Sequence, residues 1–300
     1  MVPTASIKQS TETEPTASST RGRWLASAAF VMMIAYSYWL VGLFLAFCLG
    51  DYLFLTFPDR KRLPGQWLLH FGIFIAAQLL TLLFPFTAMI LASYSLKHGF
   101  GLLPWLGIGP ISGFFLWILA DSFTEYIGHV ASHRFPILWA FHRVHHCDEL
   151  VDASTGVRHH PLEVLWSLSV QSVTAFALAP VPETILIWYF FSTLMQFYSH
   201  SRVNLPSSIN CYLESVLATP GIHRVHHSSY APQTNSNYGG IFTVWDRLFG
   251  TFCTETPEHL GLDEDVLSGK KSRDFDTLVF EPFNYLWRKW RRKKKPSVAG

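Results

Sequence analysis

The pentapeptide His-Arg-Val-His-His occurs twice, at residues 142–146 and 223–227, and another histidine pair, His129 and His133, precedes the first copy. In a helix, residues three or four positions apart lie on one face. Each pentapeptide is therefore expected to direct three imidazoles one way. Neutral imidazole is the commonest transition-metal ligand, and eight are more than one ion uses, so the pattern predicts two metals. The predicted ligands are His129, His133, His142, His145, His146, His223, His226 and His227.

Two isolated histidines are further candidate ligands. His160 precedes Pro161, and His200 ends an apolar stretch. A lone histidine at a helix end is more often a cap or a surface residue, but two metals can accept about four to six ligands each. Imidazole ligation suits iron, zinc, copper or nickel, and the spacing alone does not choose among them.

Two carboxylates share a predicted helical face with the upstream histidine pair. Asp121, Glu125, His129 and His133 are spaced by four throughout. A carboxylate one turn from a ligating histidine is placed to accept its second ring N–H or to contact the metal. Asp121 and Glu125 are therefore predicted to be catalytic residues that support the site. The alternative is an ordinary polar stripe that faces a neighbouring helix.

The composition favours a membrane protein. The chain is 49% hydrophobic and 15% charged, with a mean hydropathy of +0.22, whereas about 25% charged residues is ordinary for soluble domains. Seven of the residues 288–295 are Lys or Arg, with Trp287 and Trp290 beside them. Next to membrane spans, such a run indicates a cytoplasmic tail facing lipid headgroups rather than a nucleic-acid-binding segment. The four cysteines form no C-x-x-C motif, so neither a zinc ribbon nor a disulfide framework is expected.

The expected fold is an all-α integral membrane protein with four to five transmembrane helices and a cytoplasmic, histidine-rich, helical metal-binding cap. A span needs about 20 apolar residues. The predicted spans are 24–57, 67–94, 103–120 running on as a helix towards residue 133, and two shorter stretches, 162–179 and 184–198. Pro-Val-Pro at 180–182 separates the last two into a helical hairpin.

Charge bias predicts the orientation. Arg60, Lys61 and Arg62 lie between the first two spans, and they are expected on the cytoplasmic side with the basic tail. The histidine clusters then emerge into the cytoplasm, and the N-terminus lies outside. The predicted domains are a disordered tail (1–23), N-terminal transmembrane helices (24–120), a catalytic region that includes a 162–200 membrane hairpin (121–252), and a cytoplasmic basic tail (253–300).

The order HxxxH, HxxHH, HxxHH resembles the fatty acid hydroxylase/sterol desaturase superfamily of membrane-bound non-haem di-iron oxygenases, over about 121–252. Other motifs carry the resemblance further. They are Arg-His-His-Pro-Leu-Glu at 158–163, the single His200 after the hairpin, Asn-Tyr-Gly at 237–239 and Trp-Asp-Arg-Leu-Phe-Gly-Thr at 245–251. This ending distinguishes the chain from alkane hydroxylases and acyl-CoA desaturases.

The resemblance implies two iron ions, with zinc where overexpression mismetallates the site, and O₂ as co-substrate. It implies hydroxylation or desaturation of a lipid C–H bond in a fatty acyl, sterol-like or other membrane lipid that enters from the bilayer. The sequence has no His-Pro-Gly-Gly motif of a fused cytochrome b domain, so a separate ferredoxin or cytochrome b-type donor is expected. Two alternatives stay open: a carotenoid or ornithine-lipid hydroxylase, and a non-catalytic membrane metal-binding protein.

Overall fold

The computed structural model describes residue 36 and residues 38–53, 64–84, 87–203, 205–263 and 267–294. Two units, 1–42 and 43–300, divide the chain, and the account below concerns the second. The described residues form helices joined by loops, with isolated bridges but no strand among them, which confirms the all-α prediction for this part. The predicted disordered tail and the Arg60–Arg62 segment lie outside the described residues.

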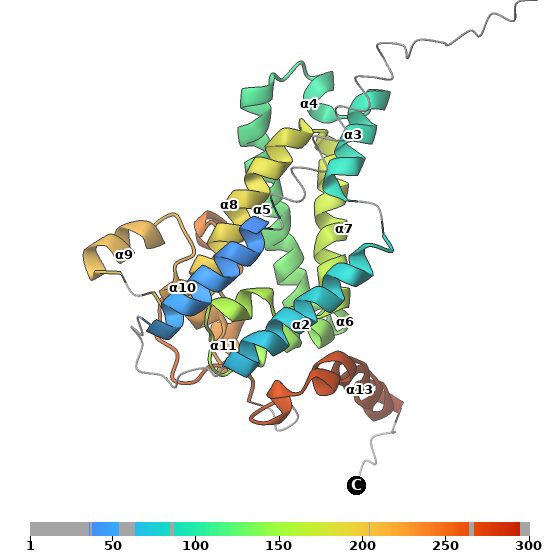
Figure 1. Cartoon of the computed structure of the whole chain (residues 1–300). Coiled ribbons are helices and arrows are strands. Elements are labelled where there is room, and N and C mark those ends of the chain that lie inside the picture. The colour runs from blue at the N-terminus through green and yellow to red at the C-terminus, as the bar shows by residue number, and fades with distance from the viewer. Residues whose placement is uncertain are drawn as a thin grey trace, which may run out of the picture. The chain divides into compact units, whose positions relative to one another are not determined.

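The helices keep the labels of Figure 1. An apolar helix at Tyr38–Leu53 comes before the labelled helices in the chain, whose bounds are given next. They are α2 (Pro64–Thr81), α3 (Ala88–His98), α4 (Leu102–Trp105), α5 (Pro110–Arg134), α6 (Pro136–His146), α7 (Pro161–Leu178), α8 (Pro182–His200), α9 (Ser207–Glu214), α10 (Pro220–His226), α11 (Ala231–Thr234), α12 (Val244–Phe249) and α13 (Phe275–Lys294). Two 3₁₀ turns, η1 (Ala153–Val157) and η2 (Lys271–Arg273), complete the list.

Proline begins each helix that carries a predicted metal ligand. It stands at the start of α5, α6, α8 and α10, and also of α7 directly after His160. Proline has the backbone φ of a helix already fixed, and its missing N–H is one that the first turn would leave unpaired. These prolines therefore fix where each helix begins, and with that the direction of every histidine further along it.

The apolar segments differ in part from the predicted spans. The stretch 67–94 is two helices, α2 and α3, because Thr87 starts α3 anew by accepting the Ile90 N–H, and Pro85 precedes it in the sequence. Of the described helices, α7 alone is long and apolar enough to cross a membrane. The segment Ala88–Trp105 with α5 makes a second, bent by 89°, if the pair counts as one span. Four to five spans therefore remain a prediction.

The centre of the second unit is built around α5. Trp117 of α5 is fully buried among Ala88 and Ala92 of α3, Ala175 of α7 and Ile185 of α8. The small alanines allow close approach between helices, and Figure 1 shows α7 and α8 running beside α5 and meeting at one end. The predicted break at 180–182 is confirmed, because α7 ends at Leu178 and α8 begins at Pro182.

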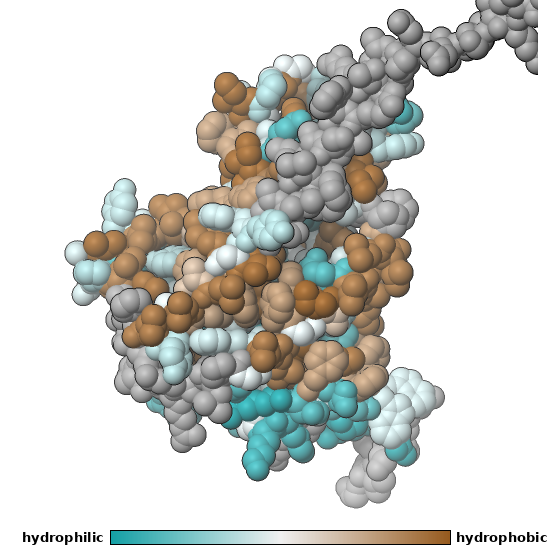
Figure 2. Space-filling view, viewed as in Figure 1, coloured by the Kyte–Doolittle hydropathy of each residue, from teal (hydrophilic) through white to brown (hydrophobic). Residues whose placement is uncertain are grey.

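Large apolar side chains remain exposed on the outside of these helices. Ile111, Phe115 and Leu119 along α5 are 79%, 64% and 52% exposed. Figure 2 shows hydrophobic residues over much of the visible face and hydrophilic residues gathered towards the end near α13. Extended apolar surface of this kind marks contact with a membrane or a partner. The surface pattern thus agrees with the apolar composition.

Candidate metal centre

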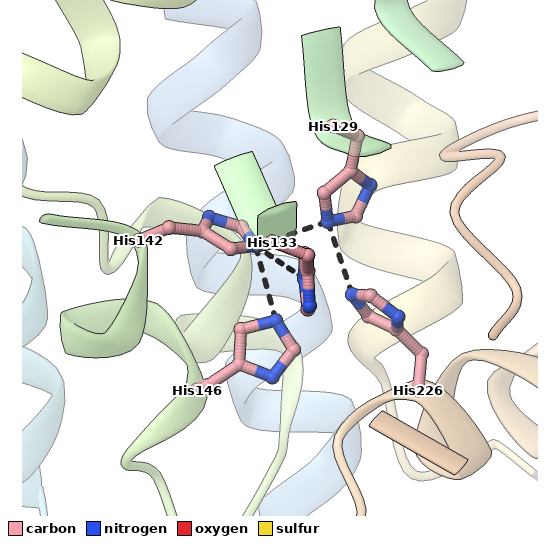
Figure 3. Close-up of side chains that lie close together, drawn as sticks. All are labelled: His129, His133, His142, His146 and His226. Atoms are coloured by element: carbon pink, nitrogen blue, oxygen red, sulfur yellow. Dashed lines mark hydrogen bonds between the residues drawn. The ribbon is translucent and has the colours of Figure 1, made fainter. Parts of the chain in front are cut away.

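Nine of the ten predicted ligands come together in two neighbouring groups. The ligand atoms within each group all lie within 4.8 Å of one another. The five-histidine group consists of His129 and His133 from α5, His142 and His146 from α6, and His226 from α10 (Figure 3). The four-histidine group consists of His145 from α6, His200 from α8, His223 from α10 and His227 directly after it.

In the five-histidine group, the Nε2 atoms face one another at the spacing a metal imposes. His142 Nε2 lies 3.1 Å from His133 Nε2 and 3.0 Å from His146 Nε2. His129 Nε2 lies 3.0 Å from the Nε2 atoms of both His142 and His226. Metal–imidazole bonds of about 2.0–2.1 Å place ligands at right angles about 3 Å apart. The donor set and its spacing therefore fit a transition-metal ion.

The outer ring nitrogens fix the tautomers that metal binding requires. His129 Nδ1–H donates to the Tyr238 carbonyl at 2.7 Å, and His142 Nδ1–H donates to Glu163 Oε1 at 2.6 Å. A carbonyl or carboxylate oxygen can only accept here, so the proton is on Nδ1 and the Nε2 lone pair points inward. Two such lone pairs 3.0 Å apart repel unless a cation lies between them.

In the four-histidine group, His200 also directs its Nε2 atom inward and donates its Nδ1–H outward. Its Nε2 lies 2.9 Å from His223 Nε2 and 3.2 Å from His145 Nε2. On the other side of the ring, His200 Nδ1–H donates to the Gln196 carbonyl at 2.8 Å. His227 completes the group and is fully buried. This second convergence of imidazole lone pairs fits a second metal ion.

Burial keeps the box histidines in the form that binds metal. It lowers the pKa of His226 to about 3. Desolvation likewise lowers the pKa values of four further histidines well below the ordinary value of an imidazole. These are His145, His146, His223 and His227. A neutral imidazole has a lone pair to donate, whereas a protonated one has none. The rings are thus ready to bind a cation near neutral pH.

Each histidine box divides its side chains between the two groups, which corrects the expectation that all three point one way. At about 100° per residue, positions i and i+4 lie about 40° apart, while i+3 lies about 60° to the other side. The first box gives His142 and His146 to the five-histidine group and His145 to the other. The second box gives His226 to the five-histidine group and His223 and His227 to the other.

His160, the tenth predicted ligand, lies outside both groups. It caps α7, with Nδ1 accepting the Leu162 N–H at 3.1 Å and Nε2 lying 3.1 Å from the Val279 carbonyl. Both ring nitrogens are therefore engaged away from the metal positions. Its neighbour His159, which the sequence analysis did not select, stacks on His145 with ring centroids 4.3 Å apart.

Glu163 is the carboxylate that orients the histidines, and the sequence analysis missed this role. Its Oε1 accepts from His142 Nδ1 at 2.6 Å and from His159 Nδ1 at 2.8 Å. The signal was present in the Arg-His-His-Pro-Leu-Glu motif, in which His159 and Glu163 are four positions apart. A carboxylate behind a ligating histidine fixes the ring orientation and raises the basicity of the ligand.

Asp121 and Glu125 lie on α5 as predicted, but neither holds a ring N–H of His129, which the Tyr238 carbonyl accepts instead. Asp121 is buried, and its Oδ2 accepts from Trp188 Nε1 at 2.6 Å. Its observed contact therefore ties α5 to α8.

Glu125 differs from Asp121 in being exposed. It lies against the backbone of Gly240, where an added Cβ would come within 2.1 Å of Glu125 Oε1. The glycine thus leaves room for the carboxylate one turn from His129.

The Asn-Tyr-Gly and Trp-Asp-Arg motifs form a support for the five-histidine group. Asp246 accepts the N–H groups of Tyr238 and Gly239, both at 2.8 Å, and the Thr251 hydroxyl at 2.7 Å. Gly239 has no room for a side chain, because an added Cβ would lie 2.2 Å from a backbone carbonyl oxygen. These contacts hold the Tyr238 carbonyl where it receives His129 Nδ1–H.

The arginine of each box points away from the metal positions. Arg143 is fully buried, with NH1 3.8 Å from Glu281 Oε1 and the guanidinium 4.3 Å from the centre of the Tyr285 ring. Arg224 donates to the Val151 carbonyl at 2.7 Å. Both arginines therefore anchor neighbouring segments to the box helices.

The fold and the paired histidine groups define a helical protein with two buried sets of imidazoles, each of which could hold a metal ion. Residues 114–251 match the family model described as fatty acid hydroxylase, and this segment contains every histidine of both groups. This segment is similar to the fatty acid hydroxylase/sterol desaturase superfamily, which confirms the resemblance seen in the sequence.

Curated relatives are similar to part of the chain. The chain is 33% identical to an alkylglycerol monooxygenase from Caenorhabditis elegans, over 62% of this chain and 34% of the relative. It is 29% identical to ornithine lipid hydroxylase OlsE from Rhizobium tropici, over 61% of this chain and 54% of that one. Against the alkylglycerol monooxygenase from Homo sapiens the identity is 34%, over 46% and 30%. The chain thus spans about a third to a half of these relatives. No solved structure matches it.

Proposed function

We propose that the chain is a membrane-bound, O₂-dependent di-iron oxidoreductase that hydroxylates a C–H bond of a membrane lipid. The observation that carries the proposal is the pair of adjacent histidine groups with their Nε2 atoms turned inward. Hydroxylation is favoured over desaturation because the relatives named above are a monooxygenase and a hydroxylase.

The residues of the chain would hold and shield the two ions. The five-histidine and four-histidine groups would each bind one, and iron bound there supplies the redox chemistry that activates O₂ for attack on a C–H bond. Glu163 orients His142, and the Tyr238 carbonyl orients His129. His146, His226 and His227 are fully buried, so these rings exclude water from their side of the site.

The proposed substrate is a lipid that enters laterally from the bilayer. The exposed apolar surface of α5 leads along the same helix that carries His129 and His133, so a substrate dissolved in lipid would approach the site without crossing water. A separate electron donor of the ferredoxin or cytochrome b type would supply reducing equivalents. Alkylglycerols and ornithine lipids, named for the relatives, are the first substrates to test.

Glu125 is proposed to act beside the five-histidine group. It is an exposed carboxylate one turn from His129, so it can hold a proton near the reacting atoms. Glu125→Gln keeps the shape but removes this capacity, and we expect turnover to fall roughly ten- to a hundredfold, the usual loss for a group that supports a metal site. Steady-state turnover with the metal content measured in parallel tests this. Unchanged turnover would make Glu125 a packing residue.

The proposed reaction is tested by expressing the chain in cells grown under ¹⁸O₂ and analysing their lipids by mass spectrometry. A hydroxylase adds one ¹⁸O atom to a lipid, whereas a desaturase removes two hydrogens and adds none. The control is His200→Ala, expressed to the same level. Purified protein should contain about two iron ions per chain. Bound metal together with an unchanged lipid profile would instead identify a non-catalytic metal-binding protein.

A further inference from the structure

The C-terminal helix α13 is docked on the back of the first histidine box by one of its faces. Leu278 is fully buried with Val144 and Cys147 of the box region. Glu281, 4% exposed, lies between Arg143 of the box and Arg288 of α13. α13 is therefore part of the same folded unit as the metal centre.

The other side of α13 carries an aromatic stripe that is largely exposed, although the ring of Phe283 also packs edge-on against Phe141 of α6, with the ring centroids 5.5 Å apart. Phe280, Phe283, Trp287 and Trp290 are separated by three or four residues, so they lie along one side of the helix. They are 60%, 47%, 55% and 54% exposed. Four large aromatic rings in a continuous exposed row are costly in water, and rows of this kind mark contact surfaces.

Basic side chains accompany the stripe at its C-terminal end. Arg291 and Arg292 are exposed, and the Arg291 guanidinium lies 4.6 Å from the centre of the Trp287 ring. Tryptophan has an apolar body and a polar N–H, and it concentrates where hydrocarbon meets water. Aromatic residues on one face with arginine and lysine around them are typical of helices that lie in the plane of an anionic membrane surface.

We propose that this face of α13 lies on an anionic lipid surface, with the aromatic rings among the headgroups and Arg291 on headgroup phosphates. The charge favours this occupant, because cations are drawn to the negative surface potential of anionic lipids. The buried face of α13 contacts α6 through the ion pair of Glu281 with Arg143. The contact of α13 with lipid would therefore also hold the first histidine box at a fixed height above the bilayer. The proposal concerns a lipid contact and does not depend on the reaction.

The test uses the full chain in nanodiscs of phosphatidylcholine alone and of phosphatidylcholine with about a third phosphatidylglycerol. Hydrogen–deuterium exchange of residues 280–292 is compared between them. Pro282 inside the helix removes one hydrogen bond, so local opening should be measurable. We expect exchange at least about tenfold slower in the anionic discs, and about 1 M NaCl should abolish the difference.

Matched variants identify the residues responsible. R291Q/R292Q should abolish the difference between the two disc types, whereas K270Q/K271Q removes the same charge from exposed positions outside α13 and should keep it. W287S should speed exchange in both disc types, because it interrupts the aromatic stripe. Equal exchange in both discs for the unmodified chain would overturn the proposal, even if an acidic protein added later protected α13. A lipid-dependent difference that survives R291Q/R292Q would overturn it too.

Discussion

At the scale of single residues, the site depends on the hydrogen-bond acceptors of the outer ring nitrogens. The outer nitrogens of His129, His142 and His200 are held by a backbone carbonyl, a carboxylate and a backbone carbonyl, respectively. These acceptors place the proton away from the metal position and leave the inner lone pair free. In these three histidines, the partner of the outer nitrogen therefore sets the tautomer and the direction of the inner lone pair.

His145→Ala removes one ring of the four-histidine group, in which its Nε2 atom lies 3.2 Å from His200 Nε2. We expect nearly complete loss of turnover and of one metal ion per chain, with normal insertion into membranes. The matched control is His160→Asn, which keeps a good helix cap on α7 and should retain both ions. Metal analysis of purified protein and activity in membranes measure both variants. Turnover above about a tenth of normal in His145→Ala would show that it acts behind a ligand rather than as one.

Glu163→Gln tests the carboxylate that accepts from His142 and His159. The amide keeps one acceptor oxygen but loses the charge that favours donation by both rings. Metal affinity should fall about ten- to a hundredfold, as measured by metal retention against a chelator. Glu183→Gln, the same change at an exposed position in the first turn of α8, should leave retention unchanged. Equal behaviour of the two variants would contradict the role assigned to Glu163.

At the scale of elements, buried polar contacts hold the site helices in place where apolar packing alone would let them slide. Asp51, on the helix Tyr38–Leu53, accepts the Ala153 N–H at the start of η1 and the Arg202 N–H just after α8, both at 2.8 Å. It therefore fixes the two segments that lead to the Arg-His-His-Pro motif and away from His200. In the sequence, the same aspartate merely interrupts an apolar run.

Asp51→Asn should destabilise the protein, because the amide can accept with only one atom and leaves one buried N–H unpaired. The expected cost is about 1–3 kcal/mol, seen as a lower thermal midpoint in detergent. Asp276→Asn, at an exposed position in the first turn of α13, is the control and should shift the midpoint little. An unchanged midpoint for Asp51→Asn would show that water or neighbouring groups replace the lost acceptor.

Local sequence signals explain which elements could be predicted. The helical form of the boxes and the break at 180–182 were predicted correctly, because helical spacing and proline act over a few residues. The division of each box between two groups was not predicted. The support of His129 was missed, since its acceptor is a backbone carbonyl 109 positions away and no side-chain type marks it. The roles of His159 and His160 could not be told apart from the sequence either, because the two histidines are neighbours and only the folded backbone decides which ring faces the box.

At the scale of the whole molecule, the arrangement predicts a single sidedness. The boxes, the Arg60–Arg62 segment and the basic end of α13 should share the cytoplasmic side, since lysine and arginine bias sets orientation. Single cysteines replacing Lys61, Glu149 and Lys294 can be probed with a membrane-impermeant thiol reagent. Glu149 is exposed beside the first box, and Cys211 and Cys253, the unburied native thiols, are replaced by serine. All three should be protected in intact cells and labelled after lysis.

The labelling result at position 149 decides on which side of the membrane the histidine boxes lie. Labelling there from outside the cell would place the histidine boxes on the opposite face. The proposed supply of electrons from the cytoplasm would then fail together with the predicted number of spans, whereas labelling at position 294 alone would contradict only the assignment of the tail.

The division of each histidine box between the two groups links the fates of the two ions. α6 and α10 each contribute rings to both groups. Displacement of either helix therefore takes imidazoles away from both metal positions. An ion entering one group orders the helices that the other needs, and by reciprocity the second ion tightens the first. Loading should therefore be cooperative, and partly metallated chains should be scarce at any iron supply. Such a centre would be either empty or complete, and a half-filled site able to reduce O₂ without a substrate would rarely form.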